Sequence, residues 1–251
     1  RFPRAYRRCG RPVTLAAFQA DLRFWFAPPV RRAKSSHQRH SGRPVALAGL
    51  RPGHYFSGMS EMPSKSELRK TLLTARREHV QAQSSAIQAL LFNRPPAPLA
   101  AKIGAEASIG LYHATPFEAP ARGYARFFLE AGHTVALPHF APNDTAMHFR
   151  AHTDPHSDSD LVRGPFGMMQ PDSDAEAIIP DILFVPLVGF TADLARLGQG
   201  GGHYDRWLAE HPGRIAIGLA WDAQLVGALP MEPHDIPLDA VVTPTRIYGL
   251  D

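Results

Sequence analysis

The sequence predicts an α/β domain in which a mixed, mainly parallel β-sheet lies between two layers of helices, a three-layer α/β/α arrangement. Short apolar runs alternate along the chain with segments of helical periodicity, the order that is typical of βαβ units. The run 181–187 (Asp-Ile-Leu-Phe-Val-Pro-Leu) is almost entirely apolar, as expected of a strand covered on both faces. A glycine-rich loop at 198–202 then leads from the strands into a helix, a pattern typical of anion binding.

Composition limits the class of protein. The 251 residues are 44% hydrophobic and 20% charged, ordinary values for a globular chain with a buried core. No stretch approaches the roughly 20 apolar residues of a membrane-spanning helix, so we expect no membrane partner. The single cysteine, Cys9, excludes an internal disulfide framework and a cysteine-based zinc cluster, and a cytoplasmic location is the simplest expectation.

Charge divides the chain into two parts. Residues 1–58 contain 12 Lys+Arg and one acidic residue, Asp21, whereas residues 59–251 contain 15 basic and 22 acidic residues. The first part is a basic leader without sustained periodicity, and we expect it to be disordered. We favour its interpretation as non-coding sequence translated in frame, because the chain does not begin with Met. An organelle transit segment and a basic arm that touches nucleic acid are the alternatives, and residues 59–251 are the expected domain.

Helices are predicted from capping signals and apolar spacing. Ser64-Lys65-Ser66-Glu67 fits a capping box, so a helix should follow with Leu68, Leu72 and Ala75 on one face. Three further helical segments are predicted: a stretch with Ile87, Leu90 and Leu91 that Pro95, Pro96 and Pro98 should end; Phe117–Ala131, with Tyr124, Phe127 and Phe128 inward and Gly132 at its end; and about His203 to Glu210.

The predicted strands are short apolar runs. They are expected at Ala107–Ala114, Thr134–Pro138, Met147–Ala151, Asp181–Leu187, Ile215–Ala220 and Asp239–Thr243. Residues 152–177 are polar and are interpreted as an excursion from the core. His148, His152 and His156 recur there at four-residue intervals, but Pro155 interrupts the segment and favours a polar surface loop over a metal site.

The segment Arg196–Arg206 has the features of a phosphate-binding loop. Glycines let the backbone approach a phosphate closely, and the helix that follows offers N–H groups and a positive dipole end. Arg196 and Arg206 add charge for bidentate contacts, and Asp205 indicates a divalent cation on the phosphates, because hard cations need carboxylate oxygens. The loop is neither a dinucleotide fingerprint, which needs glycine at His203, nor a Walker loop, and a purely structural turn is the alternative.

Other motifs accompany this loop in a fixed order. They are Lys65–Arg69, Met147–Arg150, Gly167–Pro171, Asp181–Gly189, and a last group made of Gly218–Ala220, Gln224, Pro230, His234, Asp235 and Asp239–Thr243. Together with Arg196–Asp205, they resemble the 5-formyltetrahydrofolate cyclo-ligase family from about Ser64 to Thr243. The chain departs from the family pattern at Thr191 and Leu194, where Asp and Gly are usual, and at His203, where an aromatic residue is commoner.

The resemblance implies an enzyme that uses ATP and Mg²⁺ to close 5-formyltetrahydrofolate, with or without a polyglutamate tail, to 5,10-methenyltetrahydrofolate through a phosphorylated N5-imidate. The implied ATP-binding residues are Lys65, Ser66, Glu67, Leu68, Arg69, Arg196, Leu197, Gly198, Gln199, Gly200, Gly201, Gly202, His203 and Tyr204, of which Lys65, Arg69, Arg196 and Tyr204 are the candidate catalytic residues. The implied substrate contacts are Glu118, Gln199, Gly200, Gly201, Gly202 and His203, and the implied metal ligands are Asp205 and Asp235.

Spacing adds two arguments to the resemblance. Lys65 and Arg69 are four residues apart on the predicted helix, so both side chains point to one face. Met147 and Phe149 alternate on a predicted strand and share a face, where they could cover a pterin or simply pack in the core.

The expected partner is the folate alone, bound by a monomer that binds no nucleic acid. The acidic glutamate tail of the folate needs a basic pocket, for which the candidates are Arg122, Arg126 and Arg150. Two alternative functions remain: another small-molecule phosphotransferase that uses the same loop, and an RNA-binding protein driven by the basic leader. RNA binding of that kind would weaken strongly with salt, and the acidic body argues against it.

Overall fold

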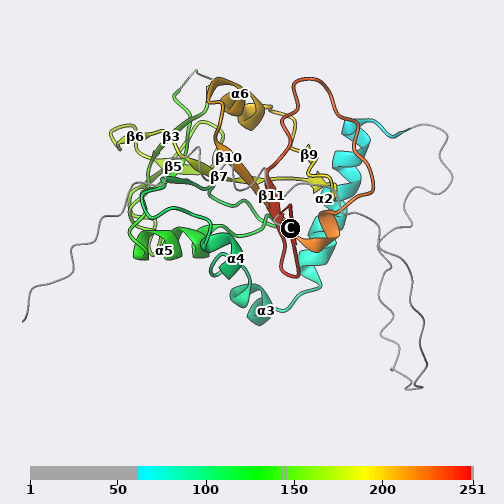
Figure 1. Cartoon of the computed structure of the whole chain (residues 1–251), viewed down its shortest axis with the longest axis horizontal. Helices are drawn as coiled ribbons and strands as arrows, with labels where there is room; N and C mark the ends of the chain where they lie inside the picture. Colours follow the sequence, from blue (N-terminus) through cyan, green and yellow to red (C-terminus); the bar gives the residue numbers. More distant parts are fainter. Residues whose placement is uncertain (1–61, 143, 145, 250–251) are drawn as a thin grey trace, which may run out of the picture.

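An eight-stranded sheet runs through the centre of the molecule (Figure 1). The structure is a computed structural model that describes residues 62–142, 144 and 146–249, so the predicted leader lies outside the described residues. The strands of this sheet are β1 (Ile109–Gly110), β2 (Val135–His139), β3 (His148–Ala151), β6 (Ala177–Ile178), β7 (Ile182–Pro186), β10 (Ile215–Leu219), β11 (Ala240–Val242) and β12 (Ile247–Tyr248).

The strand order is β12-β11-β10-β7-β1-β2-β3-β6. The five central strands, from β11 to β2, pair in parallel. The strands toward the two edges, β12, β3 and β6, pair antiparallel with their neighbours. The prediction of a mixed, mainly parallel sheet is therefore confirmed.

Helices cover both faces of the sheet, as Figure 1 shows. They are α2 (Lys65–Gln81), α3 (Ser85–Leu90), α4 (Ala97–Ala100), α5 (Arg122–Glu130) and α6 (His203–Glu210), with one 3₁₀ turn, η1 (Asp222–Gln224). α5 packs in the apolar cluster on one face and α6 packs in the cluster on the other, which confirms the three layers. α2 packs beside a small hairpin formed by β8 (Gly189–Phe190) and β9 (Arg196–Leu197).

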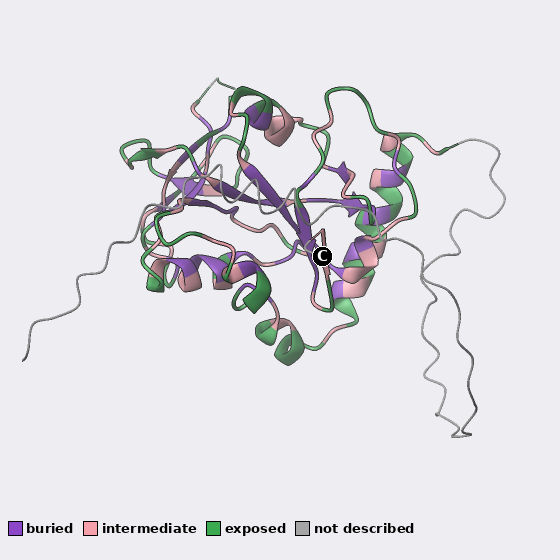
Figure 2. Cartoon of the chain, viewed as in Figure 1, coloured by how far each residue is buried: buried purple, intermediate pink, exposed green. Residues whose placement is uncertain are grey.

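The two faces of β7 show why its sequence is almost continuously apolar. Ile182 and Phe184 belong to the apolar cluster that contains α5, whereas Leu183 and Val185 belong to the cluster that contains α6. All four side chains are buried, and the strands stand out as the buried centre of the molecule in Figure 2. Because successive residues of a strand point to opposite faces, a strand between two helix layers needs apolar residues at every position.

The predicted capping box opens α2. The Ser64 side chain accepts a hydrogen bond from the backbone N–H of Glu67, and the Glu67 carboxylate accepts one from the backbone N–H of Ser64. Leu68 and Leu72 are buried as expected, but Ala75 is only half-buried. The buried position on the next turn is instead occupied by an arginine, Arg76.

Several predicted elements differ in their limits. α5 begins at Arg122 and not at Phe117, because Phe117 adopts a left-handed backbone with φ 72° that cannot continue into a helix. The strand expected at 107–114 pairs only over β1, although its flanks are buried. Pro96 caps α4, so the prolines start a helix as well as end one, in line with the preference of proline for a first turn.

The polar segment 152–177 carries structure that the sequence did not predict. It contains a separate two-stranded hairpin, β4 (Leu161–Arg163) and β5 (Met169–Pro171). Gln170 joins this hairpin to the residue that follows β2, because its side-chain amide donates to Phe140 O at 3.0 Å and accepts from Phe140 N at 3.1 Å. Across the described residues, no helix has the length and apolar character that a membrane crossing requires.

Candidate active site

A cavity of about 730 Å³ opens where β7, β1 and β2 end. Its wall comprises the start of α2, the segments after β1 and β2, the β4–β5 hairpin, the glycine loop and the segment 232–235. The carboxyl ends of parallel strands are the usual position of binding sites in open α/β sheets, because loops from neighbouring strands converge there. The sequence-predicted site residues can therefore be placed relative to one cavity.

The glycine loop forms one wall and leads directly into α6. Gly200 and Gly202 have φ values of 107° and 63°, which side chains rarely allow, and Gly202 is the N-cap residue of the helix. The loop is held from the opposite side by Arg69, whose Nε donates to Gly198 O at 2.8 Å. Backbone amides at the start of α6 therefore face a cavity that also contains basic side chains, an arrangement suited to phosphate.

Lys65 lies between two carboxylates on the opposite wall. Its Nζ is 2.6 Å from Glu232 Oε2 and 2.6 Å from Asp235 Oδ2. Partial burial opposes the charged form, but the two carboxylates outweigh it and raise the pKa of Lys65. The hydrogen bond from Lys65 lowers the pKa of Glu232, so the three groups are all charged near neutral pH.

Arg196 forms a second ion pair deeper in the cavity. Its Nη2 is 2.5 Å from Asp205 Oδ1, and only 3% of the Arg196 side chain is exposed. Asp205 Oδ1 also accepts a hydrogen bond from Ile236 N at 3.1 Å, which brings the start of α6 next to the segment that carries Asp235. The two predicted metal ligands are thus on adjoining segments, each paired with a basic side chain.

The donor set around Asp235 fits a hard divalent cation. Ligand atoms of Glu232, His234 and Asp235 lie within 4.8 Å of one another, and Asp205 is on the neighbouring segment. Carboxylate oxygens are the preferred protein ligands of Mg²⁺, which also keeps waters and phosphate oxygens in its shell. Glu232 was not among the sequence-predicted ligands, and no spacing rule distinguishes it from an ordinary exposed acid.

Glu118 lies at the opposite end of the cavity and is buried. Its Oε1 accepts from Gln199 Nε2 at 2.7 Å, and its Oε2 accepts from Thr115 N at 2.7 Å. Tyr204 is close by, and burial, with a contribution from the Glu118 charge, raises the pKa of its hydroxyl. The arrangement presents a fixed hydrogen-bond acceptor to anything bound beside the glycine loop.

An aromatic wall was not predicted from the sequence. Phe140, Phe166 and His203 pack edge-on or tilted against one another, with ring centroids 5.0–6.0 Å apart. Phe166, Met147 and Met168 also line the cavity, and Phe166 is 54% exposed. Flat apolar side chains left open to solvent beside a fixed acceptor suit a planar heterocycle.

Three residues of the implied ATP and folate sets do not line the cavity. Glu67 is occupied by the cap of α2, and Leu68 is buried beneath the helix. Phe149 is 2% exposed and packs against Trp207 at 5.2 Å. Met147 does line the cavity, and it packs in the same apolar cluster as Phe149, in agreement with the alternation of the two residues.

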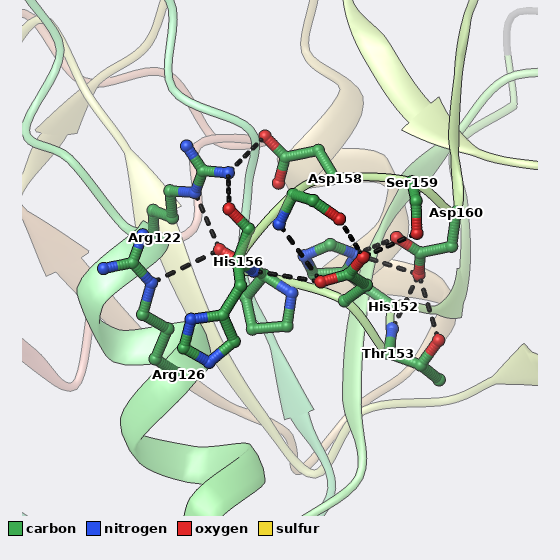
Figure 3. A network of polar contacts seen from close by, with 11 residues as sticks. Arg122, Arg126, His152, Thr153, His156, Asp158, Ser159 and Asp160 are labelled. Carbon is green, nitrogen blue, oxygen red and sulfur yellow. Dashed lines mark hydrogen bonds and ion pairs between the residues drawn. The ribbon is translucent and has the colours of Figure 1, made fainter.

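The arginines proposed for the glutamate tail lie elsewhere (Figure 3). Arg122 donates to Pro155 O at 2.7 Å and pairs with Asp158 at 2.9 Å, and Arg126 donates to Pro155 O at 3.3 Å. Arg150 donates to a carbonyl at the edge of the sheet, and none of the three lines the cavity. They fasten the polar segment after β3 to α5 and the sheet, so the tail-binding prediction is not supported by their positions.

The histidines of this segment do not converge on one point in the described chain. His152 is buried, and its Nδ1 is 3.0 Å from Asp160 Oδ1, as Figure 3 shows. His148 lies exposed on β3, and the backbone carbonyl of His156 accepts from Arg122. The three side chains therefore do not form one cluster, and His152 is a buried residue rather than part of a surface loop.

Comparison with known proteins identifies the family of the chain. The family model described as the 5-formyltetrahydrofolate cyclo-ligase family matches residues 61–244. The chain belongs to this family. The match covers every segment of the described chain that lines the cavity.

Individual relatives agree with the family match. A 5-formyltetrahydrofolate cyclo-ligase of Escherichia coli K12 is 42% identical over 99 residues, which cover 37% of this chain and 54% of that protein. The cyclo-ligase of Mycolicibacterium smegmatis is 36% identical over 125 residues, 47% of this chain and 63% of that one. The matched regions thus span less than two thirds of these relatives.

A solved relative shows the same fold. The structure of Aquifex aeolicus 5,10-methenyltetrahydrofolate synthetase superposes with a TM-score of 0.55 at 27% identity, over 74% of this chain and 92% of that one. The fold of the cyclo-ligase family therefore extends over nearly all of the described residues.

Proposed function

We propose that this chain is a 5-formyltetrahydrofolate cyclo-ligase that uses ATP and Mg²⁺ to form 5,10-methenyltetrahydrofolate. The observation that carries the proposal is the joint lining of one cavity by a phosphate-type loop and a buried acceptor carboxylate, Glu118. The family membership and the names of the relatives support the same reaction.

The triphosphate is proposed to lie along the glycine loop. Backbone amides at the start of α6 would meet phosphate oxygens, and Arg69 already lies against the loop at Gly198. Lys65 and Arg196 are the remaining cations of the cavity wall, each held by a carboxylate that a divalent cation would also attract. The proposed metal ligands are Asp205 and Asp235, and the bound cation would neutralise charge on the phosphates.

The folate is proposed to lie between the aromatic wall and Glu118. A pterin ring carries N–H donors on one edge, which a fixed carboxylate accepts, and flat faces that pack on Phe166 and His203. The loop residues Gln199 to His203 would then contact both substrates, since they line the cavity and Gln199 is hydrogen-bonded to Glu118.

The proposed chemistry consists of two displacements. The N5-formyl oxygen attacks the γ-phosphorus of ATP, ADP leaves, and the formyl group becomes a phosphorylated imidate. N10 then attacks the imidate carbon, and phosphate departs as the five-membered ring closes, while the N10 proton is released to solvent or to the departing phosphate. A formamide oxygen is a poor leaving group and its phosphate ester a good one, so the chain's main contributions are positioning and charge stabilisation.

The test is a spectroscopic assay of the methenyl product with purified full-length protein. We expect product only when both 5-formyltetrahydrofolate and MgATP are present, and a loss on the order of 100-fold in kcat/KM for Asp205→Asn. Glu210→Gln, an exposed acid on the same helix, is the matched control and should stay near the wild type.

One outcome would replace the proposal with its nearest rival. Protein that binds and hydrolyses ATP but yields no methenyl product would indicate another small-molecule phosphotransferase using the same loop. Product formation without ATP would contradict the phosphorylated intermediate.

A further inference from the structure

α2 carries a third cation beneath the cavity. Arg76 follows Lys65 by 11 residues and Arg69 by 7, so the three side chains project from one face of the helix. Lys65 and Arg69 line the cavity wall, whereas only 6% of the Arg76 side chain is exposed. Because a guanidinium does not lose its proton in proteins, a buried one needs a nearby negative charge.

The charge that Arg76 faces belongs to Glu118. Arg76 Nη1 lies 3.9 Å from Glu118 Oε1, and 5% of the Glu118 side chain is exposed. The same Nη1 donates to Leu187 O at 3.3 Å, just beyond the end of β7. In the described part of the chain the buried Nε has no hydrogen-bond partner, so hydrogen bonding alone does not account for an arginine at this position.

The other titratable groups facing Glu118 do not supply a countercharge. Burial and the Glu118 carboxylate both raise the pKa of the Tyr112 and Tyr204 hydroxyls, which therefore stay neutral. Burial lowers the pKa of His113, so its imidazole is neutral near pH 7. Among the described residues, Arg76 is the cation that forms an ion pair with Glu118.

We propose that Arg76 is a positioning residue that supplies the buried countercharge of Glu118 and directs its carboxylate into the cavity, where the carboxylate accepts the N–H groups of the pterin ring. Arg76 does not touch the substrate, and the inference rests on the function proposed above. Thr115 N and Gln199 Nε2 already donate to the two oxygens of the carboxylate. The remaining lone pairs of these oxygens are the acceptors that are left for the pterin. Without the guanidinium, a buried carboxylate takes up a proton at higher pH.

The experiment compares Arg76→Gln, which removes the charge and keeps an N–H donor, with Arg76→Lys, which keeps the charge. KM for 5-formyltetrahydrofolate and KM for MgATP are measured from mildly acidic to mildly basic pH. We expect Arg76→Gln to raise the folate KM about tenfold near neutral pH, with a steeper rise as pH falls, and to leave the MgATP KM within about twofold. Arg76→Lys should stay close to the wild-type pH profile, and Lys70→Gln, an exposed change on the same helix, is the control.

A double variant guards against a fold defect. Arg76→Gln combined with Glu118→Gln removes both charges, so no unpaired charge remains buried. We expect this double variant to match Glu118→Gln alone in folate KM and pH profile, because Arg76 acts only through that carboxylate. A further loss in the double variant, or a folded Arg76→Gln whose folate pH profile is unchanged, would overturn the inference. A wild-type protein that makes no methenyl product would instead defeat the proposed function.

Discussion

Lys65 is the residue whose surroundings differ most from its expected role. It was predicted to contact ATP, yet in the structure its ammonium group bridges Glu232 and Asp235. An ammonium placed between two carboxylates holds the positive charge that a divalent cation would otherwise supply. Lys65 and the proposed metal would therefore compete for the same oxygens until a bound phosphate offered Lys65 another partner.

This competition predicts opposite effects on two ligands. Lys65→Met should raise the affinity of the nucleotide-free protein for Mn²⁺ severalfold, because Glu232 and Asp235 lose their internal cation. The same change should weaken MgATP binding by about tenfold or more, since a phosphate contact is lost. Electron paramagnetic resonance of free Mn²⁺ measures the first effect and the MgATP KM the second.

The exposed Lys70, five residues further along α2, provides the control for that experiment. Lys70→Met changes the net charge equally and should leave both quantities near the wild type. Unchanged Mn²⁺ affinity in Lys65→Met would mean that the ammonium group does not compete with a cation.

At the scale of elements, the sequence predicted best where burial determines residue type. β7 and β10 were located almost to their limits, because strands buried on both faces admit only apolar residues. α6 was placed at its bounds because glycines mark the turn that precedes it. The β4–β5 hairpin was missed because its strand residues are mostly polar or exposed.

Prediction from the sequence was also limited for single residues of the site. Motifs pointed to the glycine loop and to Asp205, but Arg76 could not be recognised, because an arginine on a helix ordinarily lies on the solvent face. Phe166 was missed for the opposite reason, since an aromatic residue in a polar segment gives no period from which to infer its direction.

The β8–β9 hairpin shows how the chain accommodates two of its departures from the family pattern, those at Thr191 and Leu194. Leu194, at the usual glycine position, has a φ of 69°. Thr191, at the usual aspartate position, accepts a hydrogen bond from Ala195 N at 3.1 Å through its hydroxyl. The turn therefore keeps a left-handed residue and a side-chain acceptor with different amino acids.

The left-handed backbone at Leu194 predicts an unusual order of stability. Leu194→Gly and Leu194→Ala both remove the side chain, but only glycine adopts positive φ without strain. We expect the glycine variant to be more stable than the alanine variant by about 1 kcal/mol in the free energy of unfolding, measured by urea denaturation. Equal stabilities, or a more stable alanine variant, would show that the turn does not hold this conformation in solution.

For the whole molecule, the site depends on contacts between distant parts of the chain. Lys65 and Asp235 are 170 residues apart in the sequence but joined at 2.6 Å, and Gln199 reaches Glu118 across 81 residues. A parallel sheet makes this possible, because each crossover returns the chain to the same edge. No local pattern contains such contacts, so the sequence linked these positions through the resemblance to a family and not through the spacing of residues.

The location of the cavity within the chain leads to a prediction about the basic leader. Within the described part of the chain, the residues that line the cavity all lie between Ser64 and Asp235, and the body after residue 58 carries a formal charge of about −7 against +11 for the residues before it. Removal of residues 1–58 should therefore leave kcat and both KM values within about twofold of the full chain, because none of the described cavity residues is lost. RNA retention by the full chain, if present, should fall steeply with salt and disappear on removal, since it would depend on phosphate contacts of the leader. The turnover assay and filter binding of RNA at several salt concentrations test the two statements separately. A fall in kcat when residues 1–58 are removed would assign the leader a place in the enzyme. RNA binding that survives the removal of residues 1–58 would place a nucleic-acid site on the acidic body.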